Sequence, residues 1–246
     1  MKFRLGILVC ALVALIGCNA LGVNVGVTRG SGNVVSENRP VSNFHAVTLT
    51  GSGVMNITQG DTESLTIKAD DNLMPLITTT VQNGVLTIGF GSQRGEVTLI
   101  PTRPIEYTLQ VKNLDAFELT GAGNINAPAL KSESFKLESS GAGTFNLAQL
   151  DTKTLKVSSS GAGTMTISGQ TETQEVMLSG LGSYNAGDLK SNNATITVSG
   201  TGSATVWATE QLIVTISGAG SVSYYGSPQV TQSISGLGAV KKSGDK

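Results

Sequence analysis

Charged and aromatic residues are scarce in this chain of 246 residues. Asp, Glu, Lys and Arg make up 13% of it and Phe, Trp and Tyr 4%, whereas a typical globular domain carries about 25% charged residues. Without Lys2 and Arg4, which we assign to a cleaved leader, 14 of the 16 basic residues remain against 17 acidic ones, a net charge of −3. Because nucleic-acid binding depends on clustered Lys and Arg, this balance excludes a nucleic acid as partner.

Cysteine and histidine are nearly absent as well. The chain has two cysteines, Cys10 and Cys18, and one histidine, His45. We expect Cys10 to leave with the leader, so no intrachain disulfide can form. A His-based metal cluster or a Ser-His-Asp arrangement would have to use His45. No motif surrounds His45, and we interpret it as a structural or surface residue. The sequence therefore predicts no catalytic residue, no metal ligand and no cofactor.

The first 18 residues have the pattern of a bacterial lipoprotein signal peptide. Lys2 and Arg4 precede an uncharged apolar run over 5–16, which is too short to span a bilayer as a helix. The run ends in Leu15-Ile16-Gly17-Cys18, which resembles a lipobox. We predict a signal peptide over 1–17, a lipid anchor on Cys18 and a flexible tether over 18–38. The alternative is an ordinary secretory signal in which this cysteine is incidental.

The residue after Cys18 indicates which membrane holds the lipid anchor. It is Asn19, whereas Asp at this position would resemble an inner-membrane retention signal. In a Gram-negative host this favours the outer membrane. The face of that membrane, periplasmic or external, stays open.

A Gly-x-Gly triplet recurs seven times, at intervals of 18 to 20 residues. Around each triplet apolar and polar residues alternate, as in Phe135, Leu137, Phe145 and Leu147. A period of two is typical of a strand with one buried face. The triplet glycines share the inward parity and are Gly121, Gly123, Gly141, Gly143, Gly161, Gly163, Gly180, Gly182, Gly200, Gly202, Gly218, Gly220, Gly236 and Gly238.

A repeat of this length cannot bury its inward face alone, so consecutive repeats must stack. The sequence predicts an all-β fold over 39–246, a single-stranded parallel β-helix (β-solenoid) with rungs of 18–20 residues over 117–240. We expect the glycines at the corners, where a side chain would collide with neighbouring rungs and where glycine also permits a positive φ.

The segment 39–116 is predicted to form a larger first coil and an N-terminal cap. It begins with an earlier copy of the repeat around Gly51 and Gly53, and 65–69 has the pattern of a strand. Asp70-Asp71-Asn72 is expected to cap a short helical turn that contains Pro75. Asn83-Gly84 is typical of a hairpin turn.

These features together resemble a bacterial family of unknown function described as putative auto-transporter adhesin, head GIN domain. The resemblance runs from Arg39 to about Val240. It rests on 44–53, the Asp71-Asn72-Leu73 turn, 81–88 with Gly84, 107–123 with Leu114, and the later Gly-x-Gly rungs. It implies a right-handed β-helical fold and an adhesive role on exported or surface proteins, and it supplies no catalytic residues.

Three kinds of chemistry are disfavoured by the repeats. A dinucleotide fingerprint needs a third glycine, and after Gly141 and Gly143 that place is taken by Asn146. Calcium-binding nonapeptide repeats need an Asp after Gly-x-Gly-x, where this chain has apolar or aromatic residues. A polysaccharide-cleaving β-helix needs a groove of carboxylates or basic residues on one face. Here Glu133, Asp151, Glu172 and Asp188 are interpreted as scattered charges of a solvated edge.

Two outward-facing features are candidates for contact with a partner. The middle residues of the triplets form a flat strip of small residues that either fits a tight corner or contacts a second subunit. The other feature is Trp207 and Tyr225, each five residues after the second glycine of its triplet. Equal offsets predict one outward column, with Gly187 as the preceding equivalent. This pair either binds a glycan or protein, or only stacks as a structural pair.

The sequence as a whole predicts a non-enzymatic cell-envelope lipoprotein with an adhesin-like binding module. Its expected partners are the membrane, through the lipid anchor, and a glycan or protein ligand, with a homo-oligomer also open. A structural scaffold of the periplasm or outer membrane is the second hypothesis. A carbohydrate-active enzyme is a distant third.

Overall fold

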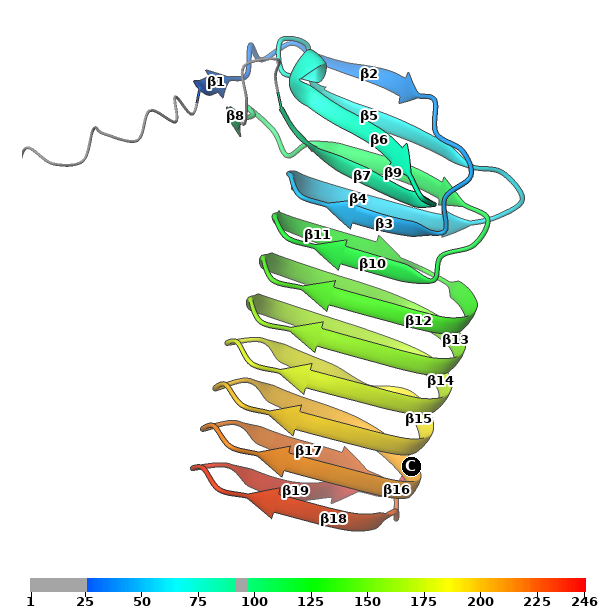
Figure 1. Cartoon of the computed structure of the whole chain (residues 1–246), viewed down its shortest axis with the longest axis vertical. Helices are drawn as coiled ribbons and strands as arrows, with labels where there is room; N and C mark the ends of the chain where they lie inside the picture. Colours follow the sequence, from blue (N-terminus) through cyan, green and yellow to red (C-terminus); the bar gives the residue numbers. More distant parts are fainter. Residues whose placement is uncertain (1–25, 92–96) are drawn as a thin grey trace, which may run out of the picture.

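Stacked turns of β-strand form the body of the molecule in the computed structural model, which describes residues 26–91 and 97–246. Figure 1 shows the turns following one another from a cap at the N-terminal end to β18 and β19 at the other end. Strands β2–β7 and β9–β19 belong to one continuous sheet of 17 strands. The predicted fold class, an all-β parallel solenoid, is confirmed.

The regular turns pair in parallel and in register. Ala122 lies opposite Ala142, and Ala142 opposite Ala162, so each Gly-x-Gly triplet stacks on the triplet before it. The strands are β10 (Ala116–Leu119), β11 (Ala122–Ala127), β12 (Leu130–Ser139), β13 (Ala142–Ser159), β14 (Ala162–Leu178), β15 (Ser183–Val198), β16 (Ser203–Ile216), β17 (Ser221–Tyr225), β18 (Gln229–Ile234) and β19 (Ala239–Gly244).

The residues that the sequence predicts to face inward are the residues that form the core. Phe135, Leu137, Phe145 and Leu147 are all buried, and the equivalent positions stay buried in the following turns as far as β16. In β17, β18 and β19 several of these positions are only partly buried or are exposed. Phe117 and Phe145 meet edge to face across the interior, with ring centroids 5.7 Å apart. Burial of one side of the strands from β10 to β16 is the main stabilising contribution that the sequence provides to the stack.

The triplet glycines are required for close approach and not for an unusual backbone torsion. A Cβ on Gly161 would lie well inside van der Waals contact of the Gly141 carbonyl oxygen and 2.8 Å from that of Ser140. The same conflict with the preceding turn recurs at the first glycine of every triplet. None of the fourteen triplet glycines has φ in the left-handed region, so these corners do not use the positive φ that glycine permits. Steric exclusion by the preceding carbonyl is the reason for glycine.

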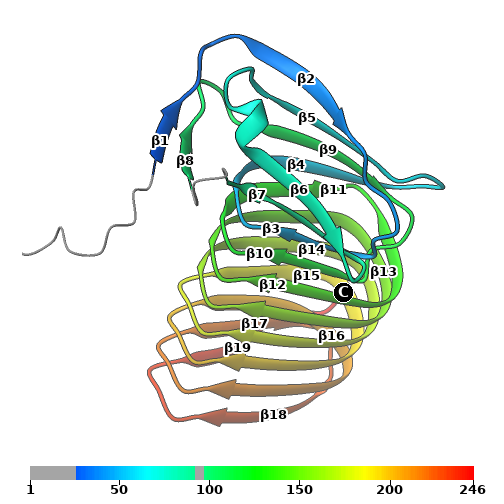
Figure 2. The ribbon, with the colours of Figure 1, turned by 45° about the horizontal axis from the view of Figure 1, so that its top comes forward.

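The N-terminal end is closed by antiparallel strands (Figure 2). β9 and β7 continue the parallel stack above β4 and β3, and β5, β2 and β6 then add to them in antiparallel pairs. The strands are β2 (Val34–Arg39), β3 (Ala46–Leu49), β4 (Ser52–Gln59), β5 (Ser64–Asp70), β6 (Ile77–Gln82), β7 (Val85–Phe90) and β9 (Glu106–Val111). β1 (Gly26–Arg29) pairs separately with β8 (Val97–Ile100). None of the described residues forms a helix with the length and apolar character to cross a membrane.

Two local predictions in the cap are confirmed. Asn83 and Gly84, with φ of 51° and 77°, make the turn of the β6–β7 hairpin. A 3₁₀ turn, η1 (Met74–Leu76), contains Pro75. Leu73, just before this turn, and Met74 within it are buried, so the turn helps to close the end of the core.

The predicted tether extends too far. Within the described residues, 26–29 and 34–39 are strands, and β2 pairs with β5 from Val34–Asp70 to Arg39–Leu65. The pairing uses backbone groups, which a Gly, Asn, Ser and Val composition does not reveal. The N-terminal part of the predicted tether and the signal peptide lie outside the described residues.

The predicted capping role of Asp70-Asp71-Asn72 is also wrong. Leu73 occupies the N-cap position of η1, without a side-chain cap. Asp70 instead accepts hydrogen bonds from the Thr102 hydroxyl (2.6 Å), the Thr102 amide (2.9 Å) and the Gly32 amide (2.8 Å). Asp71 accepts from Ser31 and Asn33. Because these donors belong to the β1–β2 connection and the segment after β8, the carboxylates fasten both segments to the end of β5.

Acid should break the Asp70 contacts, and so release the β1–β2 connection, before it affects the rest of the fold. The hydrogen bonds from Thr102, followed by that from Gly32, hold the pKa of Asp70 below its usual value. A carboxyl whose folded pKa is depressed stabilises the fold above its unfolded pKa of about 3.9, and this contribution is lost as pH falls through the lower folded pKa. We expect amide exchange in β1 and β2 to accelerate in that range, ahead of the regular turns. The Asp70→Asn variant should show fast exchange already at neutral pH.

The matched control is Asp61→Asn, because Asp61 is an exposed aspartate of the β4–β5 loop. It should leave the exchange profile unchanged. Uniform acid-induced exchange over the whole stack would contradict a specific role of Asp70.

Candidate binding surface at the wide corner

Each turn of the solenoid has two different corners. The narrow corner is the Gly-x-Gly triplet, and at the opposite edge β13, β14, β15 and β16 run through a wide corner without a break (Figure 1). A hollow of about 970 Å³ follows the wide corner across several consecutive turns. Its lining residues are Asn113, Asp115, Lys131, Ser132, Glu133, Ser134, Asp151, Thr152, Lys153, Gln170, Thr171, Glu172, Lys190 and Asn192.

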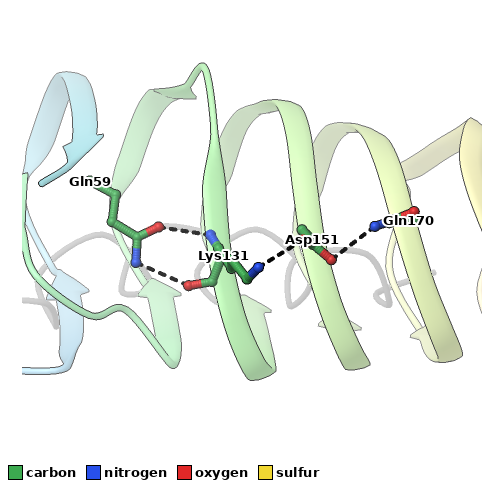
Figure 3. Close-up of polar contacts among 4 residues, drawn as sticks. All are labelled: Gln59, Lys131, Asp151 and Gln170. Atoms are coloured by element: carbon green, nitrogen blue, oxygen red, sulfur yellow. Dashed lines mark hydrogen bonds and ion pairs between the residues drawn. The ribbon is translucent and has the colours of Figure 1, made fainter.

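One column of polar side chains runs along this hollow. The sheet register places Lys131 opposite Asp151, Asp151 opposite Gln170, and Gln170 opposite Lys190. Figure 3 shows the contacts that join the column: Lys131 Nζ lies 3.4 Å from Asp151 Oδ2, and Gln170 Nε2 donates to Asp151 Oδ1 at 3.1 Å. Gln59 fixes the first end, since its Oε1 accepts from the Lys131 amide at 2.8 Å and its Nε2 donates to the Lys131 carbonyl at 3.0 Å.

A second column lies beside the first one. Lys153 donates to Glu133 at 2.8 Å, and Glu172 lies in the next turn. The hydrogen bond and charge of Lys153 lower the pKa of Glu133, and the reciprocal hydrogen bond and charge raise the pKa of Lys153. A general acid at neutral pH needs a raised carboxyl pKa, so Glu133 has the opposite electrostatics. Among residues 26–91 and 97–246, no three His, Cys, Asp or Glu side chains gather in a way that would hold a metal ion.

The acidic residues that the sequence suggested were scattered are partly gathered. Glu133, Asp151 and Glu172 share the hollow, while Asp188 lies apart and pairs with Lys246. Each of the first two carboxylates has a lysine partner. The surface can therefore offer paired polar groups to a ligand.

Trp207 and Tyr225 continue the first column towards the C-terminal end. They lie opposite each other on β16 and β17, and Trp207 lies opposite Lys190 of β15. The predicted alignment of the two aromatic residues is thus present. Both are half-buried, and Val206 and Ala208 on either side of Trp207 are buried, as the outward parity of Trp207 requires.

The surroundings of the aromatic pair differ from the prediction. The equivalent of Trp207 in the preceding turn is Lys190, because the register shifts at Gly187–Leu189. The space beside Gly187 is taken by the Tyr225 ring, which would lie 3.1 Å from a Cβ placed there. Instead of stacking, the rings are bridged by Lys246, whose Nζ lies 5.6 Å from the Trp207 centroid and 4.7 Å from that of Tyr225. Lys190 Nζ approaches Trp207 as well, at 5.9 Å.

The middle residues of the triplets form the predicted outward strip at the narrow corner. All seven are exposed, and they are Ala122, Ala142, Ala162, Leu181, Thr201, Ala219 and Leu237. The two leucines are 72% and 92% exposed. The strip is therefore open to solvent along its whole length, on the edge opposite the hollow.

The remaining predicted positions lie elsewhere. His45 is exposed, with Nδ1 3.6 Å from Asp115 Oδ2, so its predicted surface location is confirmed. Cys18 lies outside the described residues.

Lys131, Gln170 and Lys190 were missed by sequence reasoning. Their signal is present in the sequence: Lys131, Asp151 and Lys190 each follow the first glycine of their triplet by ten residues, and Gln170 by nine. Trp207 follows the first glycine of its triplet by only seven residues, because β16 lacks the bulge of the preceding turn. The distance in sequence from the first glycine of each triplet therefore predicts that the polar residues lie in one column. It does not predict that the aromatic pair belongs to the same column.

Comparison with solved structures supports the fold. The chain is similar to a "putative adhesin" from Bacteroides fragilis, with 24% identity, a TM-score of 0.81, and coverage of 87% of this chain and 99% of that one. It is also similar to a "putative lipid binding protein" from Parabacteroides distasonis (22%, TM-score 0.72, coverage 88% and 99%). A third similar structure is a "putative adhesin" from Parabacteroides merdae, with 23% identity, a TM-score of 0.69, and coverage of 89% of this chain and 99% of that one.

The sequence comparison agrees with this fold. No curated protein matches the chain. Residues 43–228 match the model of the family described as "Putative auto-transporter adhesin, head GIN domain", and this range covers most of the cap and most of the regular turns. The chain belongs to this head GIN domain family.

Proposed function

We propose that this chain is a non-enzymatic lipoprotein of the outer membrane that acts as an adhesin-like binding module and takes its ligand along the wide corner. The observation that carries the proposal is the hollow of about 970 Å³ across consecutive turns. Family membership and the structural neighbours described as adhesins agree with a binding role. A rigid, repeating surface suits binding, because a preorganised partner loses little conformational entropy on association.

The chemistry of the hollow argues for binding and against turnover. A glycoside hydrolase needs one carboxyl with a raised pKa beside an ionised one. Here the pKa of Glu133 is lowered by Lys153, and Asp151 is engaged by Lys131 and Gln170. A ligand with an acyl chain, as the name of the second neighbour suggests for that protein, would need an apolar lining. The lining of this hollow is polar and charged.

A structural scaffold is the second candidate, and the narrow-corner strip favours it. Leu181 and Leu237 are exposed on a flat row of small residues, which is a surface suited to a second copy of the chain. In this case the strip mediates self-association and the hollow has no ligand.

Replacing Cys18 by serine should release the protein from the membrane fraction. The lipobox supplies the thiol that takes the lipid, and the described residues contain no helix that would span the bilayer. The measurement is the partition of wild type and Cys18→Ser between membrane and soluble fractions. Cys10→Ser, within the leader, is the matched control and should stay membrane-bound. Retention of Cys18→Ser in the membrane fraction would contradict the anchor.

Protease treatment of intact cells separates the two candidate functions. An adhesin is exposed and should be removed, together with attachment of the cells to their ligand, whereas a periplasmic scaffold should be spared. Full protection of the chain in intact cells would contradict the adhesin proposal.

A further inference from the structure

We infer that the ligand of the wide corner is a neutral oligosaccharide that lies along the solenoid axis, with its first units in the hollow and its last unit on Trp207 and Tyr225. This inference rests on the proposed binding function and adds the chemical class of the ligand. Three features of the surface lead to it.

The first feature is charge balance. Three lysines, Lys131, Lys153 and Lys190, stand against four carboxylates, which are Asp115, Glu133, Asp151 and Glu172, and the net charge of the lining is −1. A polyanion would meet no net positive potential here, and a polycation would meet Lys131 and Lys190 at the two ends of the first column and Lys153 in the second. Since like charges across an interface are costly, the surface selects an uncharged partner.

The second feature is the alternation of hydrogen-bond donors and acceptors. Ammonium groups donate, carboxylates accept, and the amides of Gln170 and Asn192 do both. The exposed hydroxyl of Ser134 lies beside the second column, whereas Thr152, between the columns, is buried and donates to the Thr154 carbonyl. A ligand that satisfies such a surface must itself donate and accept at closely spaced atoms. Adjacent hydroxyl groups on a sugar ring do this, whereas a peptide backbone offers one donor and one acceptor per residue.

The third feature is the aromatic end of the same column. Trp207 follows Lys190 in register, and Tyr225 follows Trp207. An aromatic ring is a flat apolar surface with a polar edge, which suits the C–H face of a sugar ring. Trp207 Nε1 is buried without a hydrogen-bond partner, so the ring is positioned by packing around its edge. Lys246 lies over both rings, and a ligand that reaches them displaces it.

The test is calorimetric binding to the full chain carrying Cys18→Ser, which removes the lipid. The probes are hexasaccharides of glucose, mannose, galactose and N-acetylglucosamine, with a heparin hexasaccharide and polygalacturonate as anionic probes. We expect at least one neutral hexasaccharide to bind, with an affinity that changes less than about twofold over a tenfold rise in salt, because neutral ligands release no counter-ions.

Variants locate the binding. Gln170→Ala and Asn192→Ala should each weaken it by about tenfold, the effect of one lost hydrogen bond to a polar ligand. Trp207→Ala should weaken it by at least as much, and Lys246→Ala should strengthen it. Asn146→Ala is the matched control, since Asn146 is an exposed amide on a flat side of the stack, and its affinity should equal that of wild type. A melting curve for each variant separates lost binding from lost folding.

Two results would overturn the inference. One is binding restricted to the anionic probes and abolished by salt. The other is neutral-sugar binding that Gln170→Ala and Asn192→Ala leave unchanged. If instead the chain binds none of the sugars but still attaches cells to a protein-coated surface, and Gln170→Ala weakens that attachment, the proposed function stands and only the ligand class is wrong.

Discussion

Gly161→Val should destabilise the solenoid by about 3 kcal/mol, in the range of an overpacked core with backbone displacement. The Cβ of any other residue at Gly161 meets the carbonyl oxygens of Gly141 and Ser140 in the preceding turn. These are backbone atoms held in the hydrogen-bonded stack, so they cannot rotate away as a flexible side chain would. Relief requires the two turns to separate, and separation breaks the pairing on both sides of the corner.

The matched control is Ala162→Val, one position further along the same corner. Ala162 is the exposed middle residue of the triplet, so its side chain points outward. Its replacement should change the free energy of unfolding by less than about 0.5 kcal/mol, as is usual for surface positions. Denaturant unfolding followed by circular dichroism measures both variants. Equal stability of the two variants would show that the corner tolerates a side chain and would contradict the steric argument.

The second large effect is expected at Gln174, where Gln174→Leu should cost about 2 kcal/mol. Gln174 is buried inside the solenoid and joins two other buried polar side chains. Tyr184 donates to its Oε1 at 3.0 Å, and its Nε2 donates to Ser191 Oγ at 2.8 Å. Ser191 in turn donates to the Trp207 carbonyl at 2.7 Å. Loss of the amide leaves the Tyr184 hydroxyl buried without a partner.

A double-mutant cycle isolates this contribution. Tyr184→Phe alone removes the donor and leaves the Gln174 oxygen unsatisfied, whereas Tyr184→Phe combined with Gln174→Leu removes both groups of the pair. The double variant should therefore be less destabilised than the sum of the two single variants, by about 1 kcal/mol. Additive losses in chemical denaturation would contradict coupling between the two side chains.

The regular turns could be predicted from the sequence because their signal is local. A period of two within each repeat identifies the buried face, and the spacing of the triplets identifies the stacking partner. Tyr184 fits this pattern even though it carries a hydroxyl. Gln174 does not, because its partner is ten residues away and a polar residue at an inward position gives no indication of what will satisfy it.

The cap and the wide corner were harder to predict for a different reason. β2 pairs with β5 over about 30 residues of sequence, through backbone atoms that every residue has. Asp70 binds Thr102, which lies 32 residues away. At the wide corner, a register shift at Gly187–Leu189 places Lys190 opposite Trp207, where the sequence offsets predict Gly187. A bulge of this kind depends on packing in three dimensions, which offsets in a sequence do not record.

The two ends of the stack are unequal, and this gives the chain a direction of assembly. The antiparallel strands of the cap close one end, whereas β18 and β19 of the described chain pair only with β16 and β17. Each new turn can therefore be templated only on the open side. Synthesis delivers the cap first and then one turn after another. Each turn can therefore fold onto the preceding one before the C-terminal residues are made. The same asymmetry makes length adjustable, since duplication of a repeat behind the open end adds a turn and leaves the cap untouched.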